Sequence, residues 1–234
     1  MSLSAKPKAV IFDWDDTLVD TGAVVRNAIN VALVAMGCEP WSEEEAQRHM
    51  GPPARVLFTG LFGEDRWQEA DKIYIKAYED GIIAGLRKHE HVNEIIDALE
   101  KSGITLVVVS AKRGYLLRKE AEILGLDKHF LKMVGAGDAA NDKPHIDAVL
   151  MALSGSGIAP GQDVWFLGDS HTDLIAAKNA NCTGVLIETK LPPQEKIDQY
   201  SPDLRFKTHA DLLVYVQKWL PPSNDLANRP APKI

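Results

Sequence analysis

The stretch KAVIFDWDDT, residues 8–17, decides the fold class of this 234-residue chain. It begins with Lys8–Asp13, a short apolar run rich in strand-forming residues. An unbroken apolar run of this length between turn signals is typical of a strand buried on both faces of a parallel sheet. The aspartates Asp13, Asp15 and Asp16 are then expected at the carboxyl end of that strand.

Further apolar runs follow along the chain, and segments with apolar residues at helical spacing separate most of them. Pro144 is expected in the first turn of one of these helices. Strands that alternate with helices predict an α/β fold, a doubly wound, Rossmann-like parallel sheet covered on both faces. The additional strands are expected at Ile104–Ser110, Lys132–Ala136, Asp163–Leu167, Gly184–Glu188 and, more weakly, Leu204–Lys207.

The alternation stops between Val19 and about Glu90, where no strand run occurs and the apolar residues recur at helical spacing. We therefore expect an α/β core at 1–18 and 91–220 and an inserted small α-helical cap at 19–90. The proline-rich segment 221–234 is expected to be a loosely ordered tail. Because ligands bind at the carboxyl ends of parallel strands, an insertion that leaves from that end can act as a lid.

Composition and charge limit the classes of binding partner and the compartment that we expect for this chain. Lys plus Arg is 26 and Asp plus Glu is 33, which gives a net charge of −7 and disfavours a general nucleic-acid binder. Cys38 and Cys182 form no disulfide framework, which fits a reducing cytoplasm. No apolar run is long enough for a signal peptide or a membrane span. We expect a cytoplasmic monomer or homodimer that acts on a small molecule, with no nucleic-acid or membrane partner.

Two carboxylate clusters carry the chemistry. Extended geometry would put Asp13 and Asp15 on one side of the chain, where they repel unless a cation such as Mg²⁺ lies between them. Asp169 and Asp173 follow another predicted strand, one helical turn apart. The alternative for the first cluster is a solvated acidic turn with Thr17 as a helix N-cap. The alternative for the second is that Asp169 or Ser170 caps the helix that follows. Two clusters at two strand ends favour a divalent-metal site.

Ser110 and Lys143 are weaker indications of a phosphate-binding site. Ser110 ends a predicted strand, and a hydroxyl beside helix-start amides is a ready phosphate site, although an N-cap serine is common. Lys143 lies in the segment NDKPH and would by default be a surface residue.

The ordered set Asp13-x-Asp15-x-Thr17, Ser110, Lys143 and Gly168-Asp169-x-x-x-Asp173 resembles the four motifs of the haloacid dehalogenase superfamily of phosphotransferases. The resemblance covers residues 8 to about 220, and FDWDDTLVDT and GDSHTDLIAAKNA look most like phosphoglycolate-phosphatase-like members. It implies that Asp13 is the nucleophile, which forms an aspartyl phosphate, and that Asp15 is the general acid and base.

The same resemblance implies a Mg²⁺ site and a phosphate site. The backbone carbonyl of Asp15 and the carboxylates of Asp13 and Asp169 would hold Mg²⁺, with Asp173 joining directly or through water. Lys143 would neutralise charge on the nucleophile and the phosphate. The expected phosphate-binding residues are Thr17, Ser110 and Ala111. Arg55, in a loop between predicted cap helices, is a candidate partner for a substrate carboxylate because its guanidinium matches one, and the alternative is a solvent-exposed arginine at a helix start.

Several positions depart from the family pattern. Asp16 stands where glycine is usual, and aspartate tolerates the left-handed conformation better than most residues. Ala111 stands where asparagine is frequent, and Lys112 and Arg113 either compensate for it or are surface cations. His145 and His171 are expected to be a surface residue and a structural one.

The leading interpretation is a Mg²⁺-dependent phosphatase for a small phosphorylated metabolite, with phosphoglycolate as the best single substrate. A phosphonate C–P hydrolase is a second hypothesis, and it would need a cap lysine such as Lys72 or Lys76. A phosphomutase and a non-catalytic binding module are a third and a fourth.

Overall fold

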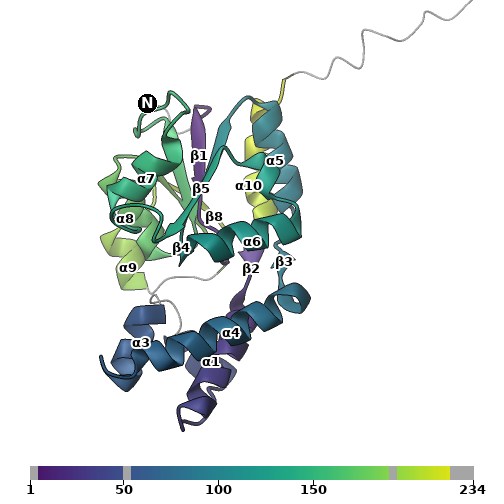
Figure 1. Ribbon diagram of the computed structural model, residues 1–234. Coiled ribbons are helices and arrows are strands. Elements are labelled where there is room, and N and C mark those ends of the chain that lie inside the picture. The colour runs from purple at the N-terminus through teal and green to yellow at the C-terminus, as the bar shows by residue number, and fades with distance from the viewer. Residues whose placement is uncertain (1–4, 50–53, 190–193, 222–234) are drawn as a thin grey trace, which may run out of the picture.

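A six-stranded parallel sheet forms the middle of the computed structural model, which describes residues 5–49, 54–189 and 194–221 (Figure 1). The strand order is β5-β4-β1-β6-β7-β8, which is 3-2-1-4-5-6 when the strands are counted along the chain. This is the doubly wound order, so the predicted fold class is confirmed. The strands are β1 (Ala9–Phe12), β4 (Thr105–Arg113), β5 (Lys132–Ala136), β6 (Val164–Gly168), β7 (Thr183–Ile187) and β8 (Leu204–Phe206).

Helices bury both faces of the sheet. Val10 and Phe12 of β1 pack in one apolar layer with α5, α6 and α10, whereas Ala9 and Ile11 pack in the other with α7 and α8. Because successive strand side chains point to opposite faces, a strand covered on both sides is apolar throughout. The helices of this part are α5 (Val92–Lys101), α6 (Gly114–Leu124), η1 (Asp127–His129), α7 (Ile146–Leu153), α8 (His171–Asn179), α9 (Gln194–Gln199), α10 (His209–Val216) and η2 (Gln217–Trp219).

The inserted segment folds into a separate helical unit beneath the sheet (Figure 1). Its helices are α1 (Gly22–Ala35), α2 (Glu43–His49), α3 (Ala54–Phe62) and α4 (Trp67–Gly85). Ile29, Leu33, Phe58 and Ala70 belong to its own apolar cluster. The predicted domain limits at residues 18 and 91 stay a prediction, and residues 222–234 of the expected tail lie outside the described residues.

Three local expectations were wrong. Two short strands, β2 (Val19–Asp20) and β3 (Arg87–Lys88), pair as an antiparallel ribbon where no strand was expected, because two residues are too few to leave a periodic signal. Pro144 precedes the first residue of α7 instead of lying in its first turn, and His145 is the N-cap. Strand β4 continues past Ser110 to Arg113, so the helix-start amides do not follow Ser110 directly.

None of the helices in the described ranges combines the length and the apolar character needed to cross a membrane.

Candidate active site

The site lies where the strand order reverses. β1 pairs with β4 on one side and with β6 on the other, and the point between β1 and β6 is where the strand order reverses, the usual ligand position in doubly wound sheets. Asp13 follows β1 directly, and its backbone N–H still donates to the Leu167 carbonyl of β6 at 2.8 Å. Asp169 follows β6 directly. The sheet itself therefore holds the two aspartates side by side.

Three carboxylates converge there. One ligand oxygen from each of Asp13, Asp169 and Asp173 lies within 4.8 Å of the others. All three residues are buried, and Asp173 is fully so. Since buried carboxylates repel one another, such a group persists only when protons or cations compensate its charge.

Lys143 supplies one cation. Its ammonium lies 2.9 Å from Asp13 Oδ1 and 2.5 Å from Asp173 Oδ1, and its side chain is only 2% exposed. The loop between β5 and α7 carries it there, with a cis peptide bond between Lys143 and Pro144. A lysine with no helical or strand periodicity around it is thus the cation of the cluster.

Asp173 has two functions in the local structure. Its Oδ2 accepts hydrogen bonds from the Ser170 backbone N–H at 2.8 Å and from the Ser170 hydroxyl at 2.6 Å, which closes a capping box at the start of α8. Its Oδ1 faces Lys143. A Cβ added to Gly168 would lie 2.1 Å from Asp173 Cγ, so glycine is required for this close approach.

The electrostatics leave the cluster short of positive charge. Burial raises the pKa of Asp13 to about 7 although Lys143 opposes this, and burial together with Asp173 and Asp13 raises the pKa of Asp169 well above its usual value. Burial acts to lower the pKa of Lys143, but Asp13 and Asp173 outweigh it and raise that pKa. The cluster therefore contains one ammonium for three carboxylates.

Unsatisfied oxygens point to the same deficit. Asp13 Oδ1 and Asp173 Oδ1 are buried, and neither accepts a well-aligned hydrogen bond from the described residues, the Lys143 contacts being ion pairs. Two buried carboxylate oxygens without well-aligned donors, with Asp169 beside them, are the hard ligands that Mg²⁺ takes. The residues present therefore fit a divalent cation.

The loop after β1 orients the neighbouring side chains. Asp16 has φ 57°, the left-handed conformation that the departure from glycine predicts for this position. The Thr17 hydroxyl donates to Asp169 Oδ1 at 3.2 Å, and the Thr17 carbonyl accepts from His209 Nε2 at 2.7 Å. Thr17 is fully buried and ties the loop to the carboxylate cluster.

Asp15 faces a different set of groups. Its Oδ1 accepts from the Thr21 hydroxyl at 2.6 Å and lies 2.7 Å from the Lys112 ammonium. Its carboxylate is not among the three that converge, so a part in metal binding through its backbone carbonyl stays a prediction.

The remaining predicted residues are less closely connected. Ser110 is buried in β4, and its Oγ accepts from the Lys112 backbone N–H at 3.2 Å. Ala111 is exposed. Arg55 lies in α3 with its guanidinium 5.2 Å from the centre of the Trp67 ring, and the contacts of the described residues do not join it to the carboxylates. The loop Gly51-Pro52-Pro53 lies outside the described residues.

Sequence reasoning missed the buried partners of Asp15. From the sequence, Lys112 fits either a compensating cation or a surface residue, and Glu120 is not among the expected site residues. A signal existed, because Glu120 falls at helical spacing among the apolar residues Leu116, Leu117 and Ala121. A carboxylate on an apolar helix face is seldom buried without a partner.

Comparison with known proteins agrees with this geometry. Residues 10–187 match the family model described as haloacid dehalogenase-like hydrolase. The phosphoglycolate phosphatase of Escherichia coli (strain K12) is 29% identical over 230 residues, which cover 88% of this chain and 91% of that protein.

Solved structures show the same similarity. A predicted phosphoglycolate phosphatase from Haemophilus somnus superposes with a TM-score of 0.81 at 26% identity, covering 91% of this chain and 99% of that one. A haloacid dehalogenase-like family hydrolase from Streptococcus pneumoniae superposes with a TM-score of 0.80 at 25% identity, covering 90% and 99%. The predicted resemblance is confirmed, and the chain belongs to the haloacid dehalogenase-like hydrolase family.

Proposed function

We propose that this enzyme is a Mg²⁺-dependent phosphatase that hydrolyses a small phosphate monoester through an aspartyl phosphate on Asp13. The observation that carries the proposal is the convergence of the carboxylates of Asp13, Asp169 and Asp173, with one ammonium, that of Lys143, paired to two of them. A phosphate ester brings further negative charge, so a site that accepts it needs both Lys143 and a divalent cation.

In the first step, an Asp13 carboxylate oxygen attacks phosphorus as the bond from phosphorus to the ester oxygen breaks. Asp15 donates its proton to that leaving oxygen, so the alcohol departs neutral. In the second step, Asp15 takes a proton from water, the water oxygen bonds to phosphorus, and the bond from phosphorus to Asp13 breaks. Inorganic phosphate leaves and both aspartates return to their starting states.

The other residues bind and neutralise. Lys143 balances the charge of Asp13 and of the phosphoryl oxygens, and the Ser110 hydroxyl donates to one of them. Mg²⁺, held by Asp13, Asp169 and the Asp15 carbonyl with Asp173 close by, would supply the positive charge that lowers repulsion between nucleophile and phosphate. Thr17 keeps Asp169 oriented through its hydrogen bond.

Phosphoglycolate is the first substrate to test, because proteins named for this substrate resemble the chain over most of their length. Its carboxylate would need a cationic partner. Arg55 is the proposed partner, since it is exposed on the cap and its guanidinium matches a carboxylate.

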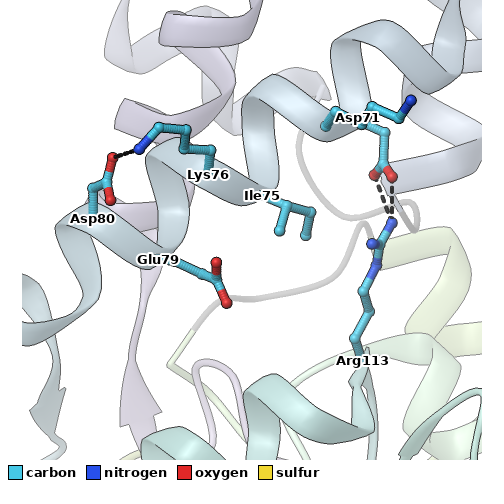
Figure 2. A pocket seen from close by; sticks show the side chains of 7 residues that line it. Asp71, Ile75, Lys76, Glu79, Asp80 and Arg113 are labelled. Carbon is cyan, nitrogen blue, oxygen red and sulfur yellow. Dashed lines mark hydrogen bonds and ion pairs between the residues drawn. The ribbon is translucent and has the colours of Figure 1, made fainter.

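The phosphonate hypothesis needs a lysine with a lowered pKa to form a Schiff base. Lys76 lies on α4 in a cleft of about 430 Å³ between the cap and Arg113, and its ammonium points to Asp80 at 2.8 Å (Figure 2). The hydrogen bond and charge of Asp80 raise the pKa of Lys76, which is the opposite of what that chemistry requires.

A turnover screen tests the proposal. Phosphate release would be measured from phosphoglycolate, glucose 1-phosphate, pyrophosphate and phosphonoacetaldehyde, with Mg²⁺ and with excess EDTA. We expect Mg²⁺-dependent release from one or more monoesters and none from the phosphonate. Full activity in EDTA, or activity with the phosphonate alone, would overturn the proposal.

A further inference from the structure

A second charge cluster lies next to the proposed site and consists of Asp15, Lys112, Glu120 and Tyr78. The Asp15 side chain is 31% exposed, and those of the other three are buried. The Lys112 ammonium lies 2.7 Å from Asp15 Oδ1 and 2.6 and 2.8 Å from the two Glu120 oxygens. The side chain of Lys112 is 6% exposed and that of Glu120 is fully buried. Lys112 is therefore a buried bridge between two carboxylates and not a surface cation.

Both Glu120 oxygens, the Lys112 ammonium and the Tyr78 hydroxyl have hydrogen-bond partners. Glu120 accepts from the Trp14 indole N–H at 2.7 Å and from the Tyr78 hydroxyl at 2.7 Å, besides its contacts with Lys112. The Lys112 ammonium also donates to the Tyr78 oxygen at 2.6 Å. An ammonium has three protons, and here they meet Asp15, Glu120 and Tyr78. A satisfied buried network holds its members in one geometry.

The cluster also joins the cap to the core. Tyr78 belongs to α4 of the cap, Glu120 to α6 of the core, and Lys112 to the end of β4. The ammonium of Lys112 lies 4.9 Å from the centre of the Tyr78 ring, which adds a cation–π contact to the hydrogen bond. The position of the Lys112 ammonium, and through it that of the Asp15 carboxylate, thus depends on where the cap lies.

We propose that Lys112 is a positioning residue that holds the Asp15 carboxylate in the orientation for proton transfer, with Glu120 anchoring Lys112 and Tyr78 of the cap completing the anchor. The proposal rests on the proposed function, in which Asp15 passes the proton to the leaving oxygen. General acid catalysis depends on a hydrogen-bond distance between the acid and the leaving oxygen. Without Lys112, the Asp15 carboxylate would be held by the Thr21 hydroxyl alone and would be a less well-placed donor.

The dependence of the rate on the leaving group separates positioning from general structural damage. An alkyl ester leaves only as its oxygen is protonated, whereas p-nitrophenyl phosphate releases a stable phenolate without a proton. The first chemical step would be followed by rapid mixing, as the burst of alcohol or phenolate released per enzyme. The variant is Lys112→Met, which keeps the length of the side chain and removes the ammonium.

We expect Lys112→Met to slow the burst with the alkyl ester by about 100-fold, the lower end of general-acid effects, with KM unchanged. The burst with p-nitrophenyl phosphate should stay close to that of the unmodified enzyme. The matched control is Lys119→Met, since Lys119 lies on α6 and pairs loosely with Glu79 of the cap at 3.6 Å. It should change neither burst. Equal losses on both esters, or no loss on either, would overturn the proposal.

If Lys112→Met fails to fold, as judged by circular dichroism, Tyr78→Phe tests the positioning of Asp15 instead. It removes only the hydroxyl, and it should lower the ratio of alkyl to aryl burst rates while both charges stay in place. An unchanged ratio would refute the anchoring through the cap. If the unmodified enzyme releases no phosphate from any ester, the proposed function itself fails, which is a separate and recognisable result.

Discussion

Two lysines at the carboxyl edge of the sheet, Lys143 and Lys112, differ in their charged and hydrogen-bonded neighbours. Lys143 pairs with two carboxylates, Asp13 and Asp173, and a third, Asp169, lies beside them. One oxygen each of Asp13 and Asp173 lacks a well-aligned hydrogen-bond donor. Lys112 faces two carboxylates, and a tyrosine hydroxyl and a tryptophan N–H donate to Glu120 as well. The first cluster is short of positive charge, whereas in the second the ammonium and both Glu120 oxygens have partners.

The difference separates a binding site from a support. The cluster of Asp13, Asp169, Asp173 and Lys143, the incomplete cluster, is stabilised when a cation enters, so it can bind ligands and perform chemistry. The cluster of Asp15, Lys112, Glu120 and Tyr78, the complete cluster, is not stabilised by a further ligand. It resists rearrangement because a broken contact leaves the buried charge of Lys112 or Glu120 unpaired. Substitutions and pH changes that act on one cluster and spare the other test this contrast.

The largest expected effect is on turnover. Asp13→Asn should lower kcat by about 10⁴-fold or more, since the amide is no nucleophile and the residue acts at the reacting phosphorus. The fold should persist, because Lys143 keeps Asp173 as its partner. Steady-state hydrolysis of p-nitrophenyl phosphate measures the loss. A rate within tenfold of the unmodified enzyme would end the assignment of the nucleophile.

The next effect is on stability and concerns the complete cluster. Glu120→Gln should lower the free energy of unfolding by about 3 kcal/mol, because it leaves the buried Lys112 with one carboxylate fewer. Urea unfolding followed by circular dichroism measures this. Glu122→Gln, an exposed neighbour on α6, is the control and should change little. Equal small effects at the two positions would mean that the buried network stabilises nothing.

The incomplete cluster should respond to pH in the opposite sense to most carboxylates. The pKa of Asp13 is about 7 in the metal-free fold against an ordinary value of 3.8, so the folded state binds the proton more tightly. This contribution to stability is present at low pH and is lost as pH rises through about 7. Between pH 5 and 8 the unfolding free energy of metal-free protein should fall by about 3 kcal/mol through this group.

Mg²⁺ should reverse that loss. Because cation and proton compete for the same oxygens, Mg²⁺ should raise the melting temperature clearly at pH 8 and hardly at pH 5. Thermal unfolding at both pH values, with and without the ion, measures this. Asp13→Asn should lack most of the pH effect. A Mg²⁺ shift that is equal at the two pH values would argue against the carboxylate site.

The smallest effect is expected at a partly exposed ion pair between cap and core. Arg113 contacts both oxygens of Asp71 at 2.7 and 2.5 Å, and the side chain of Arg113 is 39% exposed while that of Asp71 is 11% exposed (Figure 2). Solvent reaches the guanidinium and screens this pair more than it screens Lys112 and Glu120, so Arg113→Gln should cost about 1 kcal/mol of unfolding free energy. A loss as large as that of Glu120→Gln would remove the distinction between the buried and the partly exposed ion pair.

The same contrast explains what the sequence could predict. Asp13 and Asp169 directly follow apolar strands, and parallel topology brings such strand ends together, so their convergence was predictable. Lys143 carried no signal of its own and was placed only by the family resemblance. Glu120 meets Trp14 only because α6 packs against the loop after β1, and these two residues lie 106 positions apart in the chain. Local periodicity holds no information on how a helix packs against a distant loop.

The central claim is that Asp13 carries the phosphoryl group, and trapping that group tests it most directly. Asp15→Asn lacks the base for the second step, so mixing it with Mg²⁺ and p-nitrophenyl phosphate and quenching in acid should preserve the intermediate. Peptide mass spectrometry should find one phosphoryl group on Asp13 of the peptide that carries it. A phosphoryl group on another residue, or none while the unmodified enzyme turns over, would contradict the account.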